Sequence, residues 1–417
     1  MHVLLIGAGA REHAIAAALA RSPRLTRLSV APGNAGTARV ATNVPVDVAD
    51  HDAVASFCES ENVEMVVVGP EVPLVAGIAD SLAAKLPQLR VVGPGAAGAQ
   101  LEGSKAFSKA FMAEFGIPTA AYEAFTDDLA GAQQFLRKLK PPYVLKADGL
   151  AAGKGVIIAP ALEEADAELA EMFGGKFGAA SRTVVIEEFL AGPEFSVFVL
   201  TDGRDYQLLP VARDYKRVGD GDTGPNTGGM GAISPVPFVD KHVMGKVRER
   251  IVEPTLHGLR HRGIPYTGII FLGLISVGGE PYVIEYNCRL GDPETEAVLP
   301  RITSDLLAHF ETLFDGTLSQ NEIRVDSRAA ATVVMASGGY PGAYEKGKVI
   351  AGVDDVGDST VFLAGVREEG GRLLTNGGRV LAVTSFGVTG AEAAEESRRA
   401  LRGIRFEGGF YREDIGK

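Results

Sequence analysis

Four short apolar segments near the start of the chain each end at a glycine or proline turn. The segments span residues 3–6, 28–31, 65–68 and 91–92. Short apolar runs between turn signals are typical of strands buried on both faces, as in a parallel sheet. Parallel strands end at a shared edge, where ligand groups gather. The pattern predicts an N-terminal α/β domain, and Glu71 is the one acid among its strand ends.

The first of these turns tests for a dinucleotide site. Residues 7–12 read GAGARE, so Glu12 stands where the G-x-G-x-x-G fingerprint has its third glycine. A side chain there opposes the close packing of helix on strand. The second strand leads to Pro32-Gly33-Asn34, with no acid for a ribose hydroxyl. We therefore exclude a nicotinamide cofactor and expect helix N-terminal N–H groups that face a small anion.

The bulk composition limits the classes of partner. With 417 residues the chain exceeds one hydrophobic core, so several domains are expected. A formal net charge of −12 argues against nucleic acid as a partner. The only two cysteines, Cys58 and Cys288, lie far apart in sequence, which argues against a disulfide framework and fits a reducing compartment. No apolar run is long enough to span a bilayer. We expect a cytoplasmic protein without contact to membranes, a monomer with no obligate protein partner.

A candidate metal site lies in residues 282–294, which read YVIEYNCRLGDPE. The β-branched and aromatic residues at its start predict a strand, so Glu285 and Asn287 project from one face. Two oxygen donors on one face suit Mg²⁺, which takes its other ligands from water and substrate phosphates. Arg289 follows, and its planar guanidinium suits a carboxylate or phosphate. Two such donors alone are more often part of a solvated edge strand, so the neighbouring motifs decide.

A glycine-rich hairpin joins two predicted strands, residues 143–146 and 156–159. The loop between them reads ADGLAAGKG and can drape backbone N–H groups over phosphates. It is not a Walker A loop, because the spacing is one residue short, Gly155 occupies the Ser/Thr position and a strand follows. Glycine hairpins are often purely structural. Lys146 before the loop and Lys154 within it favour a triphosphate.

Three further segments differ in pattern from their surroundings. Residues 183–194 predict a strand, a turn and a strand, which can offer backbone groups to an adenine edge. Residues 213–217 precede the longest glycine-rich stretch, 219–231, which has nothing that could pack a core, and long ordered loops are usually functional. From about residue 328, short strands, glycine turns and one helix predict a small closing domain.

Together these stretches resemble the phosphoribosylamine–glycine ligase family of the ATP-grasp superfamily. The matching strings are RLGDPETE (289–296), DTGPNTGGMGA (222–232), KADGLAAGKGV (146–156), LEGSKAF (101–107), APGNAGT (31–37), VGPEVPL (68–74) and TNGGRVL (375–381). These strings are long and irregular, and they are spread over the chain from end to end.

The resemblance implies an α/β and α+β multidomain fold. It implies a Rossmann-like parallel-sheet domain over residues 1–103, a two-part ATP-grasp domain over 104–327 with a mobile lid at about 122–188, and a C-terminal α+β domain over 328–417. It also implies a reaction of purine biosynthesis, in which ATP and Mg²⁺ or Mn²⁺ drive the ligation of glycine to 5-phosphoribosylamine. Glycyl phosphate would be the intermediate, and glycinamide ribonucleotide, ADP and phosphate the products.

The family pattern also implies roles for single residues. ATP would contact Lys105, Lys146, Gly153, Lys154, Gly155, Glu187, Glu188, Phe189, Leu190 and Glu194. The metal would be held by Glu285 and Asn287. The catalytic pair would be Arg289, for the carboxylate or acyl phosphate, and Asp292, for the amine nucleophile and its proton. The phosphoribosylamine would meet Gly9, Arg11, Glu71 and Arg379, and glycine would meet Asp214, Lys216 and Gly229.

One departure from the wider superfamily concerns the metal. The strand before Glu285 contains FLGL at 271–274, with no second metal carboxylate, so phosphates and water must complete the metal shell. Two alternatives stay open. One is another ATP-grasp carboxylate–amine ligase of purine biosynthesis, against which the GDPE string after Arg289 argues. The other is a nucleotide-binding regulatory module without turnover, against which the lysines and the metal pair argue.

Overall fold

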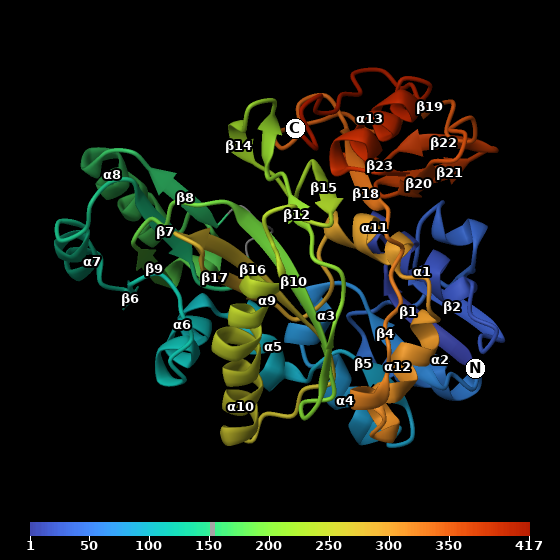
Figure 1. The fold of residues 1–417 in the computed structure, drawn as a ribbon, viewed down its shortest axis with the longest axis horizontal. Helices are drawn as coiled ribbons and strands as arrows, with labels where there is room; N and C mark the ends of the chain where they lie inside the picture. Colours follow the sequence, from blue (N-terminus) through green and yellow to red (C-terminus); the bar gives the residue numbers. More distant parts are fainter. Residues whose placement is uncertain (151–154) are drawn as a thin grey trace.

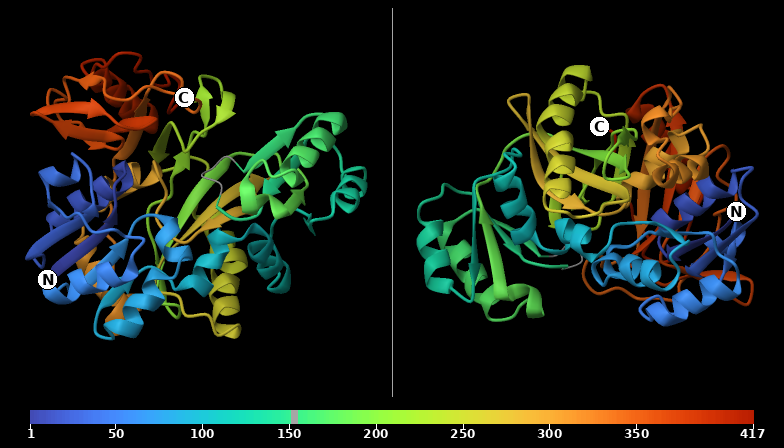
Figure 2. Two further views of the ribbon diagram at one scale, coloured as in Figure 1. Left: turned by 180° about the vertical axis from the view of Figure 1, so that it is seen from behind. Right: turned by 90° about the horizontal axis from the view of Figure 1, so that it is seen from below.

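The computed structural model describes residues 1–150 and 155–417. The blue N-terminal sheet and the red C-terminal sheet lie at one side of the molecule, and a green lobe with α7 and α8 projects from the opposite side (Figure 1). Both views of Figure 2 show the same separation, with yellow and orange segments between the two sides. The predicted multidomain α/β and α+β fold is confirmed.

A parallel sheet forms the N-terminal lobe, as the four apolar segments predict. Its strand order is β3-β2-β1-β4-β5. The bounds are Thr42–Asn43 for β3, Arg27–Pro32 for β2, His2–Gly7 for β1, Met65–Val68 for β4 and Arg90–Val92 for β5. Every residue of β1 is buried, because side chains from helices pack on both faces of the sheet. These helices are α1 (Ala10–Ala20), α2 (His51–Ser60), α4 (Ile78–Lys85) and, from far along the chain, α12 (Leu306–Asp315).

Two antiparallel sheets form the middle of the chain. The lid sheet has the order β6-β9-β7-β8, with bounds Tyr122–Thr126, Thr183–Glu187, Tyr143–Ala147 and Val156–Ala159. The second sheet has the order β11-β10-β16-β17, with bounds Tyr206–Leu208, Glu194–Thr201, Gly268–Val277 and Glu280–Asn287. Helices α7 (Leu129–Leu136) and α8 (Leu162–Phe173) pack on the lid sheet and give it a core of its own.

The C-terminal sheet takes two strands from the middle of the chain. Its order is β12-β15-β18-β23-β20, with bounds Arg213–Asp214, Gly231–Ser234, Ala329–Ala336, Arg379–Gly387 and Thr360–Leu363. Along the chain, a hairpin of β13 (Arg217–Gly219) and β14 (Thr223–Asn226) separates β12 from β15. The prediction that nothing in residues 219–231 packs a core was wrong. Met230 is 0% exposed, because it directly precedes β15 of this buried sheet.

Helix α6 (Lys105–Glu114) borders the cleft, and it begins and ends as local signals predict. Ser104 caps α6 by accepting the N–H of Phe107 at 3.0 Å, and Gly116 follows with φ +65°. The helix predicted over 241–262 is α9 (Lys241–Val247) and α10 (Glu253–His261), joined by a π turn. The remaining helices named below are α3 (Glu71–Val75), α5 (Ala96–Gly103) and α11 (Glu294–Val298).

Candidate active site

One cleft of about 530 Å³ gathers side chains from all parts of the fold. Most of the predicted site residues line it: Arg11, Glu71, Lys105, Lys146, Gly155, Glu187, Glu188, Phe189, Leu190, Glu194, Asp214, Lys216, Glu285, Asn287, Arg289, Asp292 and Arg379. Gly9 and Gly229 are not among its lining residues, although a Cβ built on Gly9 would lie 3.5 Å from Asp292 Oδ2. The predictions for Gly153 and Lys154 lie outside the described residues.

The predicted metal pair stands at the end of β17. Glu285 lies opposite Gly273 of β16, and Asn287 lies opposite Phe271, so β16 offers no carboxylate beside them. A Cβ on Gly273 would lie 3.0 Å from Glu285 Cγ, so glycine leaves room for the glutamate. In the described part of the chain, no group of three His, Cys, Asp or Glu side chains is arranged to hold a metal ion. The two oxygens fit Mg²⁺ or Mn²⁺ only if substrate phosphates and water supply the remaining ligands.

Three lysines line one end of the cleft, where the triphosphate was predicted. Glu187 Oε1 pairs with Lys146 Nζ and Glu187 Oε2 with Lys109 Nζ, both at 2.9 Å. Lys105 Nζ donates to the Gly149 carbonyl at 3.0 Å. Burial lowers the pKa of Lys105, and it lowers the pKa of Lys109 to about 8 although Glu187 opposes the shift. The carboxylate of Glu187 is thus committed to lysines, so only its backbone is available to an adenine.

The predicted adenine segment follows β9 directly. Glu188 exchanges two hydrogen bonds with the backbone of Ala121, one from its N–H and one to its carboxylate, both at 2.9 Å. Phe189 is 42% exposed and lines the cleft beside Leu190. Among the described residues, neither the carbonyl of Glu188 nor the N–H of Leu190 has a hydrogen-bond partner. An acceptor and a donor two residues apart suit the edge of a base.

A lysine between carboxylates stands farther along the cleft. Lys216 Nζ contacts Glu194 Oε2 at 2.8 Å. Burial lowers the pKa of Lys216, but the carboxylates of Asp214, Glu194 and Glu285 overcome this and raise it well above its usual value. Lys216 in turn lowers the pKa of Glu194, whereas burial raises that of Asp214. Lys216 and Glu194 therefore form a charged pair beside Asp214, and the group can meet an ammonium or a hydroxyl group.

Arg289 joins the metal strand to the N-terminal lobe. Its Nε lies 3.3 Å from Glu71 Oε2, its Nη2 2.7 Å from Glu102 Oε1, and its Nη1 donates to the Leu290 carbonyl at 3.1 Å. Burial opposes ionisation of Glu71, yet Arg289 and then Arg11 lower its pKa. Among residues 1–150 and 155–417, three of the five guanidinium N–H groups have acceptors, and one on each Nη is left for an anionic ligand.

Asp292 connects this loop to the C-terminal lobe. Its Oδ1 lies 2.9 Å from Arg379 Nη1, which also donates to the carbonyls of Gly228, Gly229 and Asp292. Gly229 has φ +110°, and a Cβ there would overlap Pro293. The contacts of Arg379 with Asp292 and the three carbonyls all use Nη1. Within the described residues, Arg379 Nε and Nη2 have no acceptor and are available to a phosphate.

The anion expected at the first glycine turn is part of the protein itself. Gly9 N–H donates to Glu12 Oε2 at 2.6 Å, and Glu12 Oε1 lies 2.6 Å from Arg11 Nε. A Cβ on Gly7 or Gly69 would overlap the Glu12 side chain, so the glycines make room for this carboxylate. The expectation of an open anion site at the helix N-terminus was therefore wrong, because a side chain of the same helix occupies it.

Several cleft residues were not predicted. Lys109 and Glu102 contact predicted residues directly, as described above. Glu294 lies in α11, where burial and then the charge of Asp214 raise its pKa to about 7. Glu102 and Glu294 fall inside the strings LEGSKAF and RLGDPETE, which were the available signal. Lys109 lies one helical turn after Lys105, and this spacing on the same face was the signal for it.

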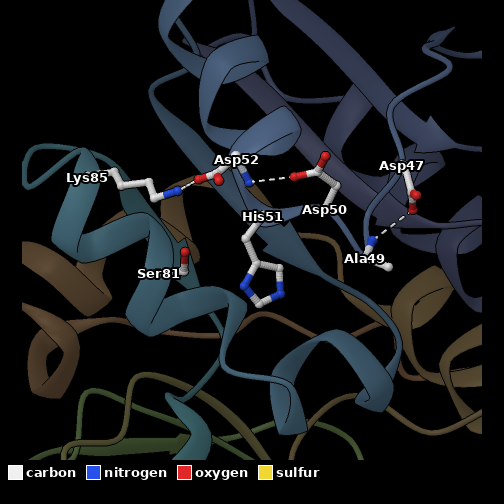
Figure 3. Close-up of a pocket in the computed structure, with 7 residues that line it drawn as sticks. All are labelled: Asp47, Ala49, Asp50, His51, Asp52, Ser81 and Lys85. Atoms are coloured by element: carbon white, nitrogen blue, oxygen red, sulfur yellow. Dashed lines mark hydrogen bonds and ion pairs between the residues drawn. The ribbon is translucent and has the colours of Figure 1, made fainter.

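A second hollow of about 590 Å³ lies apart from this cleft, between the start of α2 and helix α4. Its lining residues are Asp47, Ala49, Asp50, His51, Asp52, Ser81 and Lys85 (Figure 3). Asp50 accepts the N–H groups of Asp52 and Ala53 at 3.0 Å and so caps α2. Lys85 pairs with Asp52. Three carboxylates and one lysine line this hollow, and the lysine is already paired with Asp52, so the hollow does not suit an anionic substrate.

Within the residues that the structure describes, none of the helices has the length and apolarity needed to cross a membrane.

Two antiparallel sheets that place lysines and the predicted metal pair in one cleft define an ATP-grasp protein. The chain matches the family models for phosphoribosylglycinamide synthetase in three consecutive parts. These are the N domain over residues 1–102, the ATP-grasp (A) domain over 103–295 and the C domain over 330–417. The chain belongs to the phosphoribosylglycinamide synthetase family.

Individual relatives agree with this assignment. The chain is 50% identical to phosphoribosylamine--glycine ligase of Rhizobium meliloti (strain 1021), over 100% of this chain and 98% of that protein. The crystal structure of the phosphoribosylamine--glycine ligase from Thermotoga maritima aligns with a TM-score of 0.87 at 37% identity and covers 100% of both chains. Biotin carboxylase from Campylobacter jejuni shares the fold at 14% identity and a TM-score of 0.70, over 98% of this chain and 92% of that one.

Proposed function

We propose that this protein ligates glycine to 5-phosphoribosylamine, with ATP as the energy source, in purine biosynthesis. The observation that carries the proposal is the cleft itself, where the metal pair, the lysines, Arg289 and Asp292 meet in a chain that matches the family from end to end. We also propose a cytoplasmic monomer, with domains at residues 1–103, 104–327 and 328–417 and a lid at about 122–188.

The first step needs charge neutralisation. A carboxylate oxygen of glycine attacks the γ-phosphorus of ATP, the bond to the β–γ bridging oxygen breaks, and ADP leaves. Lys105 and Lys146 hold the phosphates, and Glu188 and Leu190 offer their backbones to adenine. When bound by Glu285 and Asn287, Mg²⁺ or Mn²⁺ neutralises part of the phosphoryl charge. Arg289 aims two N–H groups at the carboxylate and, after transfer, at the acyl phosphate.

The second step needs a nucleophile in place. The amine of phosphoribosylamine attacks the carbonyl carbon of glycyl phosphate, the bond to the phosphate oxygen breaks, and one amine proton leaves. Asp292 is held by Arg379 through Oδ1, so its Oδ2 is the atom that accepts this proton. Arg379 Nε and Nη2 hold the 5-phosphate, with help from Arg11. Gly9 contributes only as a small residue beside Asp292, because its N–H is already bound by Glu12.

The glycine pocket is the remaining part of the proposal. Asp214 and Glu194 suit the glycine ammonium, and Lys216 lowers the pKa of Glu194 and so favours its charged form. Gly229 packs against Pro293 behind the cleft lining, where a side chain would not fit and would displace the Asp292 loop.

The experiment is substrate-dependent ADP release. We expect purified protein with ATP, Mg²⁺ and phosphoribosylamine to release ADP with glycine and not with formate or bicarbonate. Release with formate or bicarbonate and none with glycine would instead identify a different carboxylate–amine ligase.

A further inference from the structure

Glu102 is a buried acid with no part in the steps above. It lies in the last turn of α5, and its side chain is only 7% exposed. The carboxylate faces the end of β17, where the metal pair and Arg289 stand. The two segments are 187 positions apart in sequence at the Arg289 contact.

Four donors from three consecutive residues converge on this carboxylate. Oε2 accepts the backbone N–H of Cys288 at 2.8 Å and lies 3.1 Å from its Sγ. Oε1 accepts from Arg289 Nη2 at 2.7 Å. With its amide turned to satisfy both ends, Asn287 also donates from Nδ2 to Glu102 Oε1 and to the Tyr286 carbonyl, each at 3.1 Å.

The contact to Asn287 has a chemical consequence. An asparagine amide presents either oxygen or NH₂ in nearly the same shape, and only the oxygen can bind a metal. Both oxygens of Glu102 already accept hydrogen bonds, Oε1 from Arg289 and Oε2 from Cys288, so Glu102 faces Asn287 as an acceptor. Glu102 therefore selects the orientation in which Asn287 Nδ2 points to it and Oδ1 is left for the metal. The same carboxylate holds Arg289 at the end of the strand.

We propose that Glu102 is a positioning residue for the metal and for the phosphoryl group. It acts through Asn287, whose amide oxygen it keeps turned to the metal. It also acts through Arg289, whose guanidinium group it holds at the end of the strand that carries Glu285. The inference rests on the proposed function for the identity of the substrates, but its effect on metal binding does not need them.

The test is a titration of Mn²⁺ against protein saturated with a non-hydrolysable ATP analogue, followed by electron paramagnetic resonance of the free ion. Partners that orient metal ligands are worth about 10- to 100-fold in affinity, so we expect Glu102→Gln to weaken Mn²⁺ binding by at least about tenfold. Affinity for the nucleotide without metal should change by less than about twofold, because Glu102 touches neither lysines nor the adenine segment. In the assay for glycine-dependent ADP release, kcat should fall more than the KM for ATP rises.

A matched control is Glu114→Gln, which removes another glutamate–arginine pair, to Arg262, outside the cleft. We expect it to leave Mn²⁺ binding and turnover unchanged. If Glu102→Gln does not fold, Glu102→Asp keeps the charge and withdraws the oxygens by one methylene, and the same loss is expected.

A double change separates positioning from general damage. Asn287→Asp places two carboxylates against each other and should weaken Mn²⁺ binding, whereas Glu102→Gln with Asn287→Asp restores one donor facing one acceptor. We expect the double variant to bind Mn²⁺ more tightly than the sum of the two losses predicts. Additive losses, or wild-type Mn²⁺ affinity in folded Glu102→Gln, would overturn the inference. Wild-type protein without glycine-dependent ADP release would overturn the proposed function and leave the Mn²⁺ comparison valid.

Discussion

Removal of the Lys146 charge should be the most informative single change at the phosphate end of the cleft. Lys146 shares Glu187 with Lys109, so the three groups carry one net positive charge. Lys146→Met keeps the apolar stem and removes the ammonium. Glu187 then still pairs with Lys109, so the variant leaves no unpaired buried carboxylate and should fold.

The magnitude follows from Coulomb's law. At an effective dielectric constant of about 20, unit charges about 4 Å apart interact by about 4 kcal/mol. The Lys146 side chain is only 6% exposed, so solvent should screen little of its attraction for a bound phosphate. Allowing for solvent in an open cleft, we expect a loss of about 2–4 kcal/mol, which is about 30- to 800-fold in Kd for ATP.

Isothermal titration calorimetry with a non-hydrolysable ATP analogue and Mg²⁺ measures this loss. Lys176→Ala is a suitable control, because Lys176 is also a lid lysine between two glutamates, Glu168 and Glu171, but lies on the surface. It should bind the nucleotide like the wild type. Nucleotide affinity within about twofold of wild type in folded Lys146→Met would refute a phosphate role for this lysine.

Three further changes test other parts of the molecule. Asp292→Asn should leave the calorimetric affinity for ATP unchanged and slow the formation of glycinamide ribonucleotide by at least about 100-fold, since a positioned base typically contributes that much; turnover at the wild-type rate would remove Asp292 from the mechanism. Burial and then the charge of Arg39 lower the pKa of His13 from 6.5 to about 4, so the unfolded state binds more protons in this window. The free energy of unfolding should therefore be undiminished above pH 6.5 and fall by up to about 3 kcal/mol towards pH 4. Urea titrations over this range should show a shallower fall in His13→Asn, and an equal fall in both proteins would assign the slope to other groups. Gly229→Ala should lower the thermal midpoint and raise the KM for glycine, because a left-handed φ and overlap with Pro293 cost about 1–3 kcal/mol; Gly245→Ala, which has nothing within 4 Å, should do neither.

The strands and caps of this protein could be predicted because they depend on neighbours in sequence. The apolar run at 65–68 is β4 without any change of bounds, and the cap at Ser104 lies where a hydroxyl precedes a helix. The spacing of Glu285 and Asn287 was enough to place both on one face at the end of β17. Periodicity and capping act over a few residues, so one sequence suffices to recognise them.

The segment 219–231 shows the limit of prediction from local patterns. Its glycines indicate a loop, yet its last residue, Gly231, begins β15, which pairs with β18 about a hundred positions later. Short strands of this kind gain their stability from the partner strand and not from their own residues. No local pattern could therefore identify them, and the burial of Met230 could not be anticipated.

The sequence alone determined the kinds of chemical group in the cleft, their spacing along each strand and the family to which the strings belong. Only the tertiary structure decided which groups neutralise one another. It paired Glu102 with Arg289, placed Glu187 between two lysines and put Glu12 in the turn that seemed open to an anion. The reason is physical: charges interact through space, and the separations that govern them are set when distant segments pack, not by their order along the chain.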